Sequence, residues 1–120
     1  MSQIIKLHAY SLSPDNSPII VSITVGNLQR GTTDLFLDGV KLNSKSIVDS
    51  FSDKKIGLSD ALKGKQLTIS TTIFDINKNG NEVSYRYKIK GGTKVLNPAG
   101  SKVTVTEGGV AHFFIRVFLV

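Results

Sequence analysis

Apolar and polar residues alternate along most of this chain, and this alternation restricts the fold more than any other feature of the sequence. It is clearest in residues 66–75, 82–90 and 110–119. Because successive side chains of a β-strand point to opposite faces, the pattern predicts strands with one buried and one exposed side. In the last segment the predicted core row is Ala111, Phe113, Ile115, Val117 and Leu119. Helix is expected only as a single turn that begins near Ser59 or Asp60.

Clusters of Gly, Pro, Asn and Asp divide the chain into about seven to nine short strands, a number and spacing typical of a sandwich or barrel. At 120 residues the chain has the size of one domain and not of two. We therefore expect residues 1–120 to form a single all-β domain, an antiparallel β-sandwich that resembles immunoglobulin-like or C2-like Greek-key domains in strand count. A partly open barrel of the OB type is the alternative.

Two turns predict how neighbouring strands pair. Asp38-Gly39 lies between apolar residues and predicts a hairpin, because type I′ turns need positive φ at both central positions. Residues 66–75 and 82–90 are joined by a turn rich in Asn and Gly, and we expect them to form the main hairpin. In residues 3–12 the row expected to face the core is Ile5, Leu7 and Ala9, which leaves Lys6, His8 and Tyr10 outside.

The chain has no cysteine, which excludes disulfide bonds, thiolate metal sites and a cysteine nucleophile. Its first residues lack the basic region and apolar run of a secretory signal, and no stretch approaches the ~20 apolar residues of a membrane helix. These features predict a full-length cytoplasmic protein without membrane insertion. Secretion by a leaderless route is the open alternative.

The net charge of +6 comes from the second half of the chain. Residues 1–60 contain six bases and six acids, whereas residues 61–120 contain nine bases and three acids. We therefore expect the second half to present the positive surface of the protein, which makes an anionic partner a reasonable hypothesis.

A row of basic residues is the first candidate site. Arg86, Lys88 and Lys90 share the outward face of the strand expected at residues 82–90, and Lys94 follows in a glycine-rich loop that can form an anion-binding nest. This row is a candidate surface for nucleic acid or another polyanion. The alternative is a solvated lysine face that protects the sheet from aggregation. The two tyrosines of this strand alternate inward, where no base can stack on them.

The final strand carries the second candidate. Phe114 and Phe118 lie on its outward row, about 14 Å apart at a rise of ~3.4 Å per residue, where polar side chains are expected. Large apolar side chains on a second face indicate either an interface or burial by other parts of the fold.

The sequence offers only weak candidates for metal binding and catalysis. Asp75, Asn77 and Asn79 match the first ligand positions of a calcium loop, but an arginine stands where a bidentate carboxylate is required, and a polar turn is the alternative. His8 and His112 are expected to be partly exposed strand residues. The sequence contains no nucleophile elbow. We expect no metal and no cofactor.

These observations favour a non-enzymatic interaction or structural module, a subunit of a larger assembly that contacts a protein partner or further copies of itself. An anion- or ligand-binding module that uses the basic row is the alternative, with nucleic acid, another polyanion or carbohydrate as its ligand. A small enzyme with a site around His8 and His112 is the third hypothesis. It requires a concave pocket that holds a histidine beside a carboxylate or hydroxyl.

Overall fold

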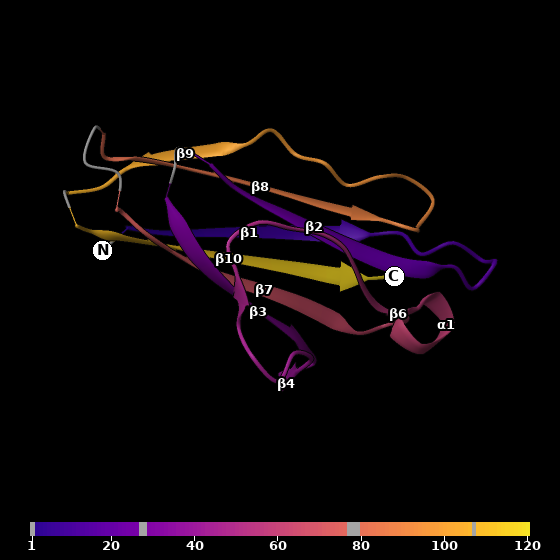
Figure 1. Cartoon of the computed structure of the whole chain (residues 1–120). Coiled ribbons are helices and arrows are strands. Elements are labelled where there is room, and N and C mark those ends of the chain that lie inside the picture. The colour runs from indigo at the N-terminus through magenta and orange to yellow at the C-terminus, as the bar shows by residue number, and fades with distance from the viewer. Residues whose placement is uncertain (1, 27–28, 77–79, 107) are drawn as a thin grey trace.

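The protein consists of two β-sheets packed face to face (Figure 1). The computed structural model describes residues 2–26, 29–76, 80–106 and 108–120. In sheet A the strand order is β1 (Ser2–Tyr10), β10 (Val110–Leu119), β7 (Gln66–Phe74), β3 (Arg30–Leu37) and β4 (Val40–Lys41), and β5 (Ile47–Val48) also pairs with β3. In sheet B the order is β6 (Phe51–Leu58), β2 (Pro18–Gly26), β8 (Glu82–Lys90) and β9 (Ser101–Thr104). The helical turn α1 (Ser59–Leu62) follows β6.

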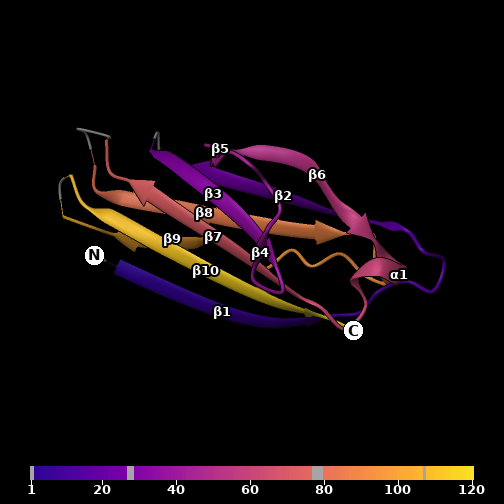
Figure 2. The same ribbon diagram turned by 90° about the horizontal axis from the view of Figure 1, so that it is seen from below.

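The predicted all-β sandwich is confirmed, but the prediction that its strand pairs are all antiparallel is wrong at one place. β1 and β10 run parallel, with Ile5 opposite Phe114 and Tyr10 opposite Leu119. Figure 2 shows the two strands side by side at one edge of sheet A. A parallel pair needs a long connection, and nearly the whole chain lies between these strands. The immunoglobulin-like Greek key stays a prediction.

The inward rows of both sheets form one hydrophobic core. Burial alternates along β2, β7, β8 and β10, as the sequence pattern predicts. At the centre, Tyr85 stacks on Phe113 with ring centroids 4.3 Å apart. The Tyr85 hydroxyl lies 2.8 Å from Thr71 Oγ1, so this buried polar group has a partner. Burial nevertheless raises the pKa of Tyr85 well above its usual value.

The hairpin predicted between residues 66–75 and 82–90 is wrong. β7 pairs with β10 and β3 in sheet A, whereas β8 pairs with β2 and β9 in sheet B. Their buried rows face each other across the core, as the contact between Thr71 and Tyr85 shows. The chain crosses from one sheet to the other between these strands. The alternating pattern of the two strands is compatible with both arrangements. Their apolar rows can be buried side by side in one sheet, or opposite each other in two packed sheets.

The first strand faces the other way from its predicted orientation. Tyr10 is buried and His8 is half-buried, whereas Ile5, Leu7 and Ala9 are exposed. The Tyr10 hydroxyl bonds main-chain atoms of the loop after β8, and the His8 ring contacts a tyrosine of β8. These polar partners on sheet B hold the histidine and tyrosine inward at the open edge of the sandwich. The aliphatic row therefore lies on the outer surface.

The predicted hairpin at Asp38-Gly39 is confirmed. Leu37 pairs with Val40 across it, and the two turn residues have φ angles of 48° and 80°. Positive φ at both positions is what a type I′ turn needs. The helical turn is also confirmed, although its cap position is Leu58, just before the predicted capping residues.

Candidate anion-binding groove

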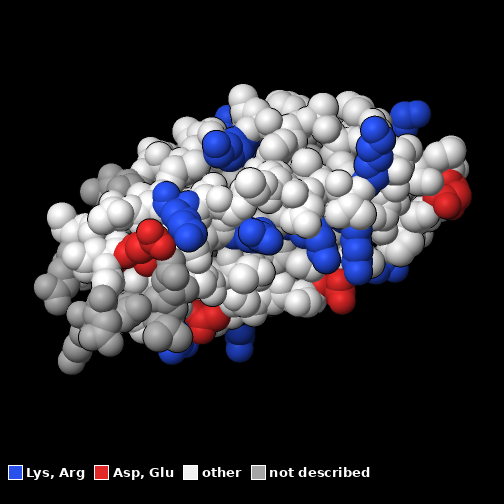
Figure 3. Space-filling model, turned by 90° about the horizontal axis from the view of Figure 1, so that it is seen from above, with Lys and Arg blue, Asp and Glu red and all other residues white. Residues whose placement is uncertain are grey.

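The outer face of sheet B carries a hollow of about 380 Å³. β8 contributes Arg86, Lys88 and Lys90 to its lining, and the other lining residues are Ser22, Thr24, Ser52, Asp53, Tyr87 and Asn97. Figure 3 shows this face, where lysine and arginine side chains form a band along the molecule and few acidic side chains lie among them. The three basic residues of the predicted row therefore come together in one open site.

The register between β2 and β8 explains why this face is hollow. Ser22 lies opposite Lys88, and Thr24 lies opposite Arg86. Directly paired residues of neighbouring strands point to the same face of the sheet. The short hydroxyl side chains of β2 therefore form a polar floor, and the long basic side chains of β8 form a wall beside it.

A second hollow of about 270 Å³ continues the first toward β9. Both hollows are lined by Thr24 and Arg86, and the second also by Ser84, Tyr85, Gly100, Ser101 and Lys102. The Arg86 guanidinium packs over Gly100, where an added Cβ would lie 3.4 Å from its Nε. We call the two hollows together the basic groove.

The basic groove holds more positive than negative charge. Lys90 Nζ lies 2.9 Å from Asp53 Oδ1. At the β9 end, Lys102 Nζ lies 3.9 Å from a glutamate oxygen. Within the described residues, neither Arg86 nor Lys88 takes part in an ion pair. These two cations are therefore available to an anion from outside.

Lys94, predicted with the basic row, lies away from the groove. Its side chain is exposed in the loop after β8, and its carbonyl oxygen accepts a hydrogen bond from the Tyr10 hydroxyl at 2.6 Å. The N–H of Gly92 donates to Tyr10 Oη at 2.9 Å, and that of Thr93 donates to Ser11 O at 3.0 Å. The N–H groups of Gly92 and Thr93 in this glycine-rich loop both donate to the segment around Tyr10. They are therefore not available to form an anion-binding nest.

Sequence reasoning misses Asp53, because Ile47, Val48 and Phe51 predict only a short strand in this part of the chain. In the structure β6 extends from Phe51 to Leu58 with irregular register against β2. Asp53 has a φ of 57°, in the left-handed region that aspartate tolerates better than most residues. The outward direction of Ser22 and Thr24 is readable from alternation, but their pairing with β8 is not.

The outer face of sheet A carries an apolar patch. Phe118 is 46% exposed and Phe114 is half-buried, so internal burial, the alternative considered for this row, is wrong for Phe118. On the neighbouring strand Ile5 and Leu7 are 56% and 62% exposed, and Ile5 lies opposite Phe114. We call these four residues the apolar face. Sequence reasoning misses half of it because it places the aliphatic row of β1 inside.

The two histidines lie on opposite faces of sheet A. His8 points inward and its Nε2 bonds the Tyr87 hydroxyl, so its predicted outward position is wrong. His112 points outward as predicted, and its Nδ1 lies 2.8 Å from Thr72 Oγ1. Burial, with a smaller effect from the charge of Lys6, lowers the pKa of His8. The two histidines therefore do not share one site, and each has a hydroxyl partner of its own.

The calcium motif falls only partly on described residues, because Asn77 and Asn79 lie outside them. Asp75 is buried, and its Oδ1 accepts a hydrogen bond from Gln29 Nε2 at 2.8 Å. Gln29 Oε1 in turn accepts one from the Ile76 N–H at 2.7 Å. In the described part of the chain, no three His, Asp or Glu side chains are placed to hold a metal ion.

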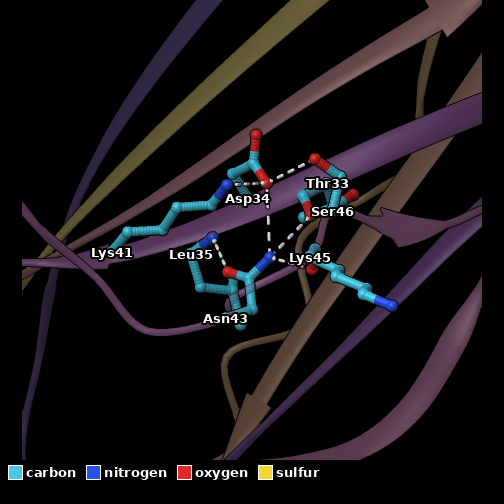
Figure 4. A network of polar contacts seen from close by, with 7 residues as sticks. All are labelled: Thr33, Asp34, Leu35, Lys41, Asn43, Lys45 and Ser46. Atoms are coloured by element: carbon cyan, nitrogen blue, oxygen red, sulfur yellow. Dashed lines mark hydrogen bonds and ion pairs between the residues drawn. The ribbon is translucent and has the colours of Figure 1, made fainter.

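Another polar cluster lies at the edge of sheet A, where β4 and β5 leave a gap beside β3 (Figure 4). Asn43 Oδ1 accepts a hydrogen bond from the Leu35 N–H at 2.8 Å, and its amide donates to Lys45 O at 2.8 Å. Asp34 Oδ1 accepts from Ser46 Oγ at 2.8 Å. Burial opposes ionisation of Asp34, but hydrogen bonds from Ser46 and Asn43 and the charge of a lysine lower its pKa. The cluster fixes the segment between β4 and β5.

None of the protein-family models, curated proteins or solved structures compared with this chain matches it. Nor does the described part of the chain contain a helix that is long and apolar enough to cross a bilayer. The case for a function therefore rests on the geometry and charge of the basic groove and of the apolar face.

Proposed function

We propose that this protein is a non-enzymatic polyanion-binding module and that the basic groove is its binding site. The observation that supports this most is the position of Arg86, Lys88 and Lys90 along one open hollow. Among the described residues that line this hollow, one is acidic, Asp53. A site with this excess of cations attracts anions and holds them more weakly as salt rises.

The spacing of the cations suits a ligand that is a chain. Alternate residues of a strand lie about 6.8 Å apart, so the three basic residues of β8 cover about 14 Å. Lys102 on β9 extends the row. A polyanion that follows β8 meets these cations one after another and releases its own counterions as it binds. Ser22, Thr24 and Asn97 add uncharged hydrogen-bond donors for oxyanions.

Binding of fluorescently labelled dextran sulfate, measured by anisotropy at several salt concentrations, tests the proposal. We expect the logarithm of the affinity to fall linearly with the logarithm of the salt concentration. A triple variant with Arg86→Gln, Lys88→Gln and Lys90→Gln should bind at least about tenfold more weakly and show a smaller salt slope, because three charge contacts are lost.

The matched control is a triple variant with Lys45→Gln, Lys63→Gln and Lys65→Gln. It makes the same change in net charge at exposed positions outside the groove. Equal loss of affinity in both triple variants would show that overall charge, and not the groove, holds the ligand. Unchanged affinity in the groove variant would rule the groove out as the site.

The apolar face supports a second candidate function, that of a structural module which associates with further copies of itself. Ile5, Leu7 and Phe118 are each roughly half exposed on two adjacent strands. Arg116 lies opposite Leu7, between Phe114 and Phe118, so this face combines apolar side chains with one cation. Groups of exposed apolar side chains beside polar ones mark contact surfaces more often than single exposed apolar residues do.

Sedimentation velocity over a range of protein concentrations tests this second candidate. We expect a concentration-dependent dimer or larger assembly that Leu7→Ser and Phe118→Ser weaken. Val40→Ser is the control, since Val40 is an exposed aliphatic residue on the opposite edge of sheet A. A chain that stays monomeric up to about 1 mM has no self-association of biological strength and would refute the candidate.

A further inference from the structure

The basic groove already contains one anion of its own, the carboxylate of Asp53. Asp53 belongs to β6, and its Oδ1 lies 2.9 Å from Lys90 Nζ on β8, on the far side of β2. Its N–H donates to Ser22 Oγ at 3.0 Å, which fixes the backbone beside the groove floor. The carboxylate therefore reaches across β2 to the basic wall.

The surroundings of Asp53 keep it charged. The hydrogen bond from Lys90 and the charge of Lys90, with a further effect of Lys88, lower the pKa of Asp53. The end of the groove formed by Lys88 and Lys90 thus stabilises an oxyanion, and the Asp53 carboxylate shows where such a group lies.

Arg86 marks a second position for an anionic group. It is exposed and takes part in no ion pair within the described residues. Its guanidinium lies over Gly100, where the absence of a side chain leaves it accessible. A planar guanidinium can hold an oxyanion through two parallel hydrogen bonds. Arg86 lies about 14 Å along β8 from Lys90, so one extended ligand can reach both positions.

The lining of the groove argues against nucleobases. Tyr85 and Tyr87 are 2% and 5% exposed, and their rings point into the core. Proteins that bind single-stranded nucleic acid rely on exposed aromatic side chains on which bases stack. Ser22, Thr24 and Asn97 offer hydroxyl and amide groups instead, which suit the hydroxyl groups of sugars.

We propose that the basic groove binds an acidic oligosaccharide, one anionic group of which replaces the Asp53 carboxylate at Lys90 while another meets Arg86. This inference rests on the proposed polyanion-binding function and narrows it to one ligand class. Asp53 then acts as a built-in competitor, because the ligand has to displace it from Lys90. Removal of this carboxylate should therefore strengthen binding.

The experiment compares wild type, Asp53→Asn and Asp49→Asn in anisotropy titrations with a labelled heparin-derived octasaccharide at one salt concentration. Asp49 is a matched control, because it also has a left-handed φ, 58°, and also forms an ion pair, with Arg30 at 2.8 Å, but lies outside the groove. Asparagine adopts this backbone conformation readily, so both variants should fold, which circular dichroism checks. We expect Asp53→Asn to bind about two- to fivefold more tightly and Asp49→Asn to bind nearly as wild type does.

Three outcomes count against the inference, and they are distinguishable. Equal affinities of Asp53→Asn and Asp49→Asn would show that Asp53 does not occupy a ligand position. An oligothymidylate of equal charge that binds as tightly as the octasaccharide would overturn the ligand class and leave the polyanion function intact. If the wild type binds neither of these probes nor dextran sulfate at low salt, the proposed function itself is wrong.

Discussion

His8 links the stability of this fold to pH. Its pKa is lowered by burial and by the charge of Lys6, so the unfolded chain binds a proton at this histidine more readily than the folded chain does. The stabilising effect is therefore complete above the ordinary histidine pKa of about 6.5, and it is lost as the pH falls through the lowered folded value. We expect the free energy of unfolding in urea to fall as the pH is lowered from about 7 to 5.

A pair of variants assigns this pH dependence. His8→Gln should flatten the decline, because glutamine does not titrate. His112→Gln is the control, because it leaves the contact of His8 with Tyr87 in place, so the decline caused by His8 should remain. A decline that persists unchanged in His8→Gln would assign the proton uptake to another group.

Gly92 is required by close packing at the same edge of the sandwich. A Cβ added there would lie 2.3 Å from the Ser11 carbonyl oxygen and 2.7 Å from the Tyr10 ring. Gly92→Ala should therefore lower the free energy of unfolding by about 1–3 kcal/mol, measured by urea denaturation. Gly80→Ala is the control, because an added Cβ at Gly80 meets no atom of the described residues within 4 Å, and it should change stability little.

At the scale of elements, Asn43 substitutes for a missing strand beside β3. Its side chain accepts a hydrogen bond from the Leu35 N–H, and Leu35 is fully buried. Asn43→Ala leaves that donor without its partner and should cost about 1–3 kcal/mol of unfolding free energy. Lys45→Ala should cost little, because Lys45 contributes its carbonyl oxygen to the cluster and its side chain is exposed. Thermal denaturation of both variants compares them.

The strands themselves could be predicted from alternation, but their pairing could not. The inward rows of β2, β7, β8 and β10 follow from the sequence because both sheets bury one side of each strand. The prediction places the wrong side of β1 inward. At this edge of the sandwich, the hydrogen bonds of Tyr10 determine which side of the strand faces the core, and the aliphatic row does not. Whether β7 and β8 share a sheet depends on partners far away in sequence.

For the candidate site as well, the sequence predicts the residues of one strand but not their neighbours on other strands. The basic row of β8 is a property of one strand, and alternation alone predicts that Arg86, Lys88 and Lys90 share a face. Ser22 joins it through β2, which pairs with β8, and Asp53 joins it from β6, on the far side of β2. Their contribution depends on register between distant strands, which a single sequence does not reveal.

At the scale of the whole molecule, β1 is an edge strand of sheet A and needs protection from pairing with other chains. Lys6 lies on the same side of β1 as His8 and Tyr10, yet it is exposed. A charge on the inner side of an edge strand prevents another strand from adding to it. Lys6→Val would create an uninterrupted aliphatic run at residues 4–7. We expect this variant to aggregate faster than wild type, as measured by light scattering. Lys45→Val, in a loop, should not aggregate faster than wild type.

The parallel pair of β1 and β10 has a consequence for how this protein is made. Translation delivers β1 about 100 residues before β10, its neighbour in sheet A. At typical rates of ~5–20 residues per second, the nascent β1 waits roughly 5–20 s for its partner. During that interval the main-chain N–H and C=O groups of β1 that pair with β10 lack their partners. Sheet A is therefore completed only when β10 has left the tunnel.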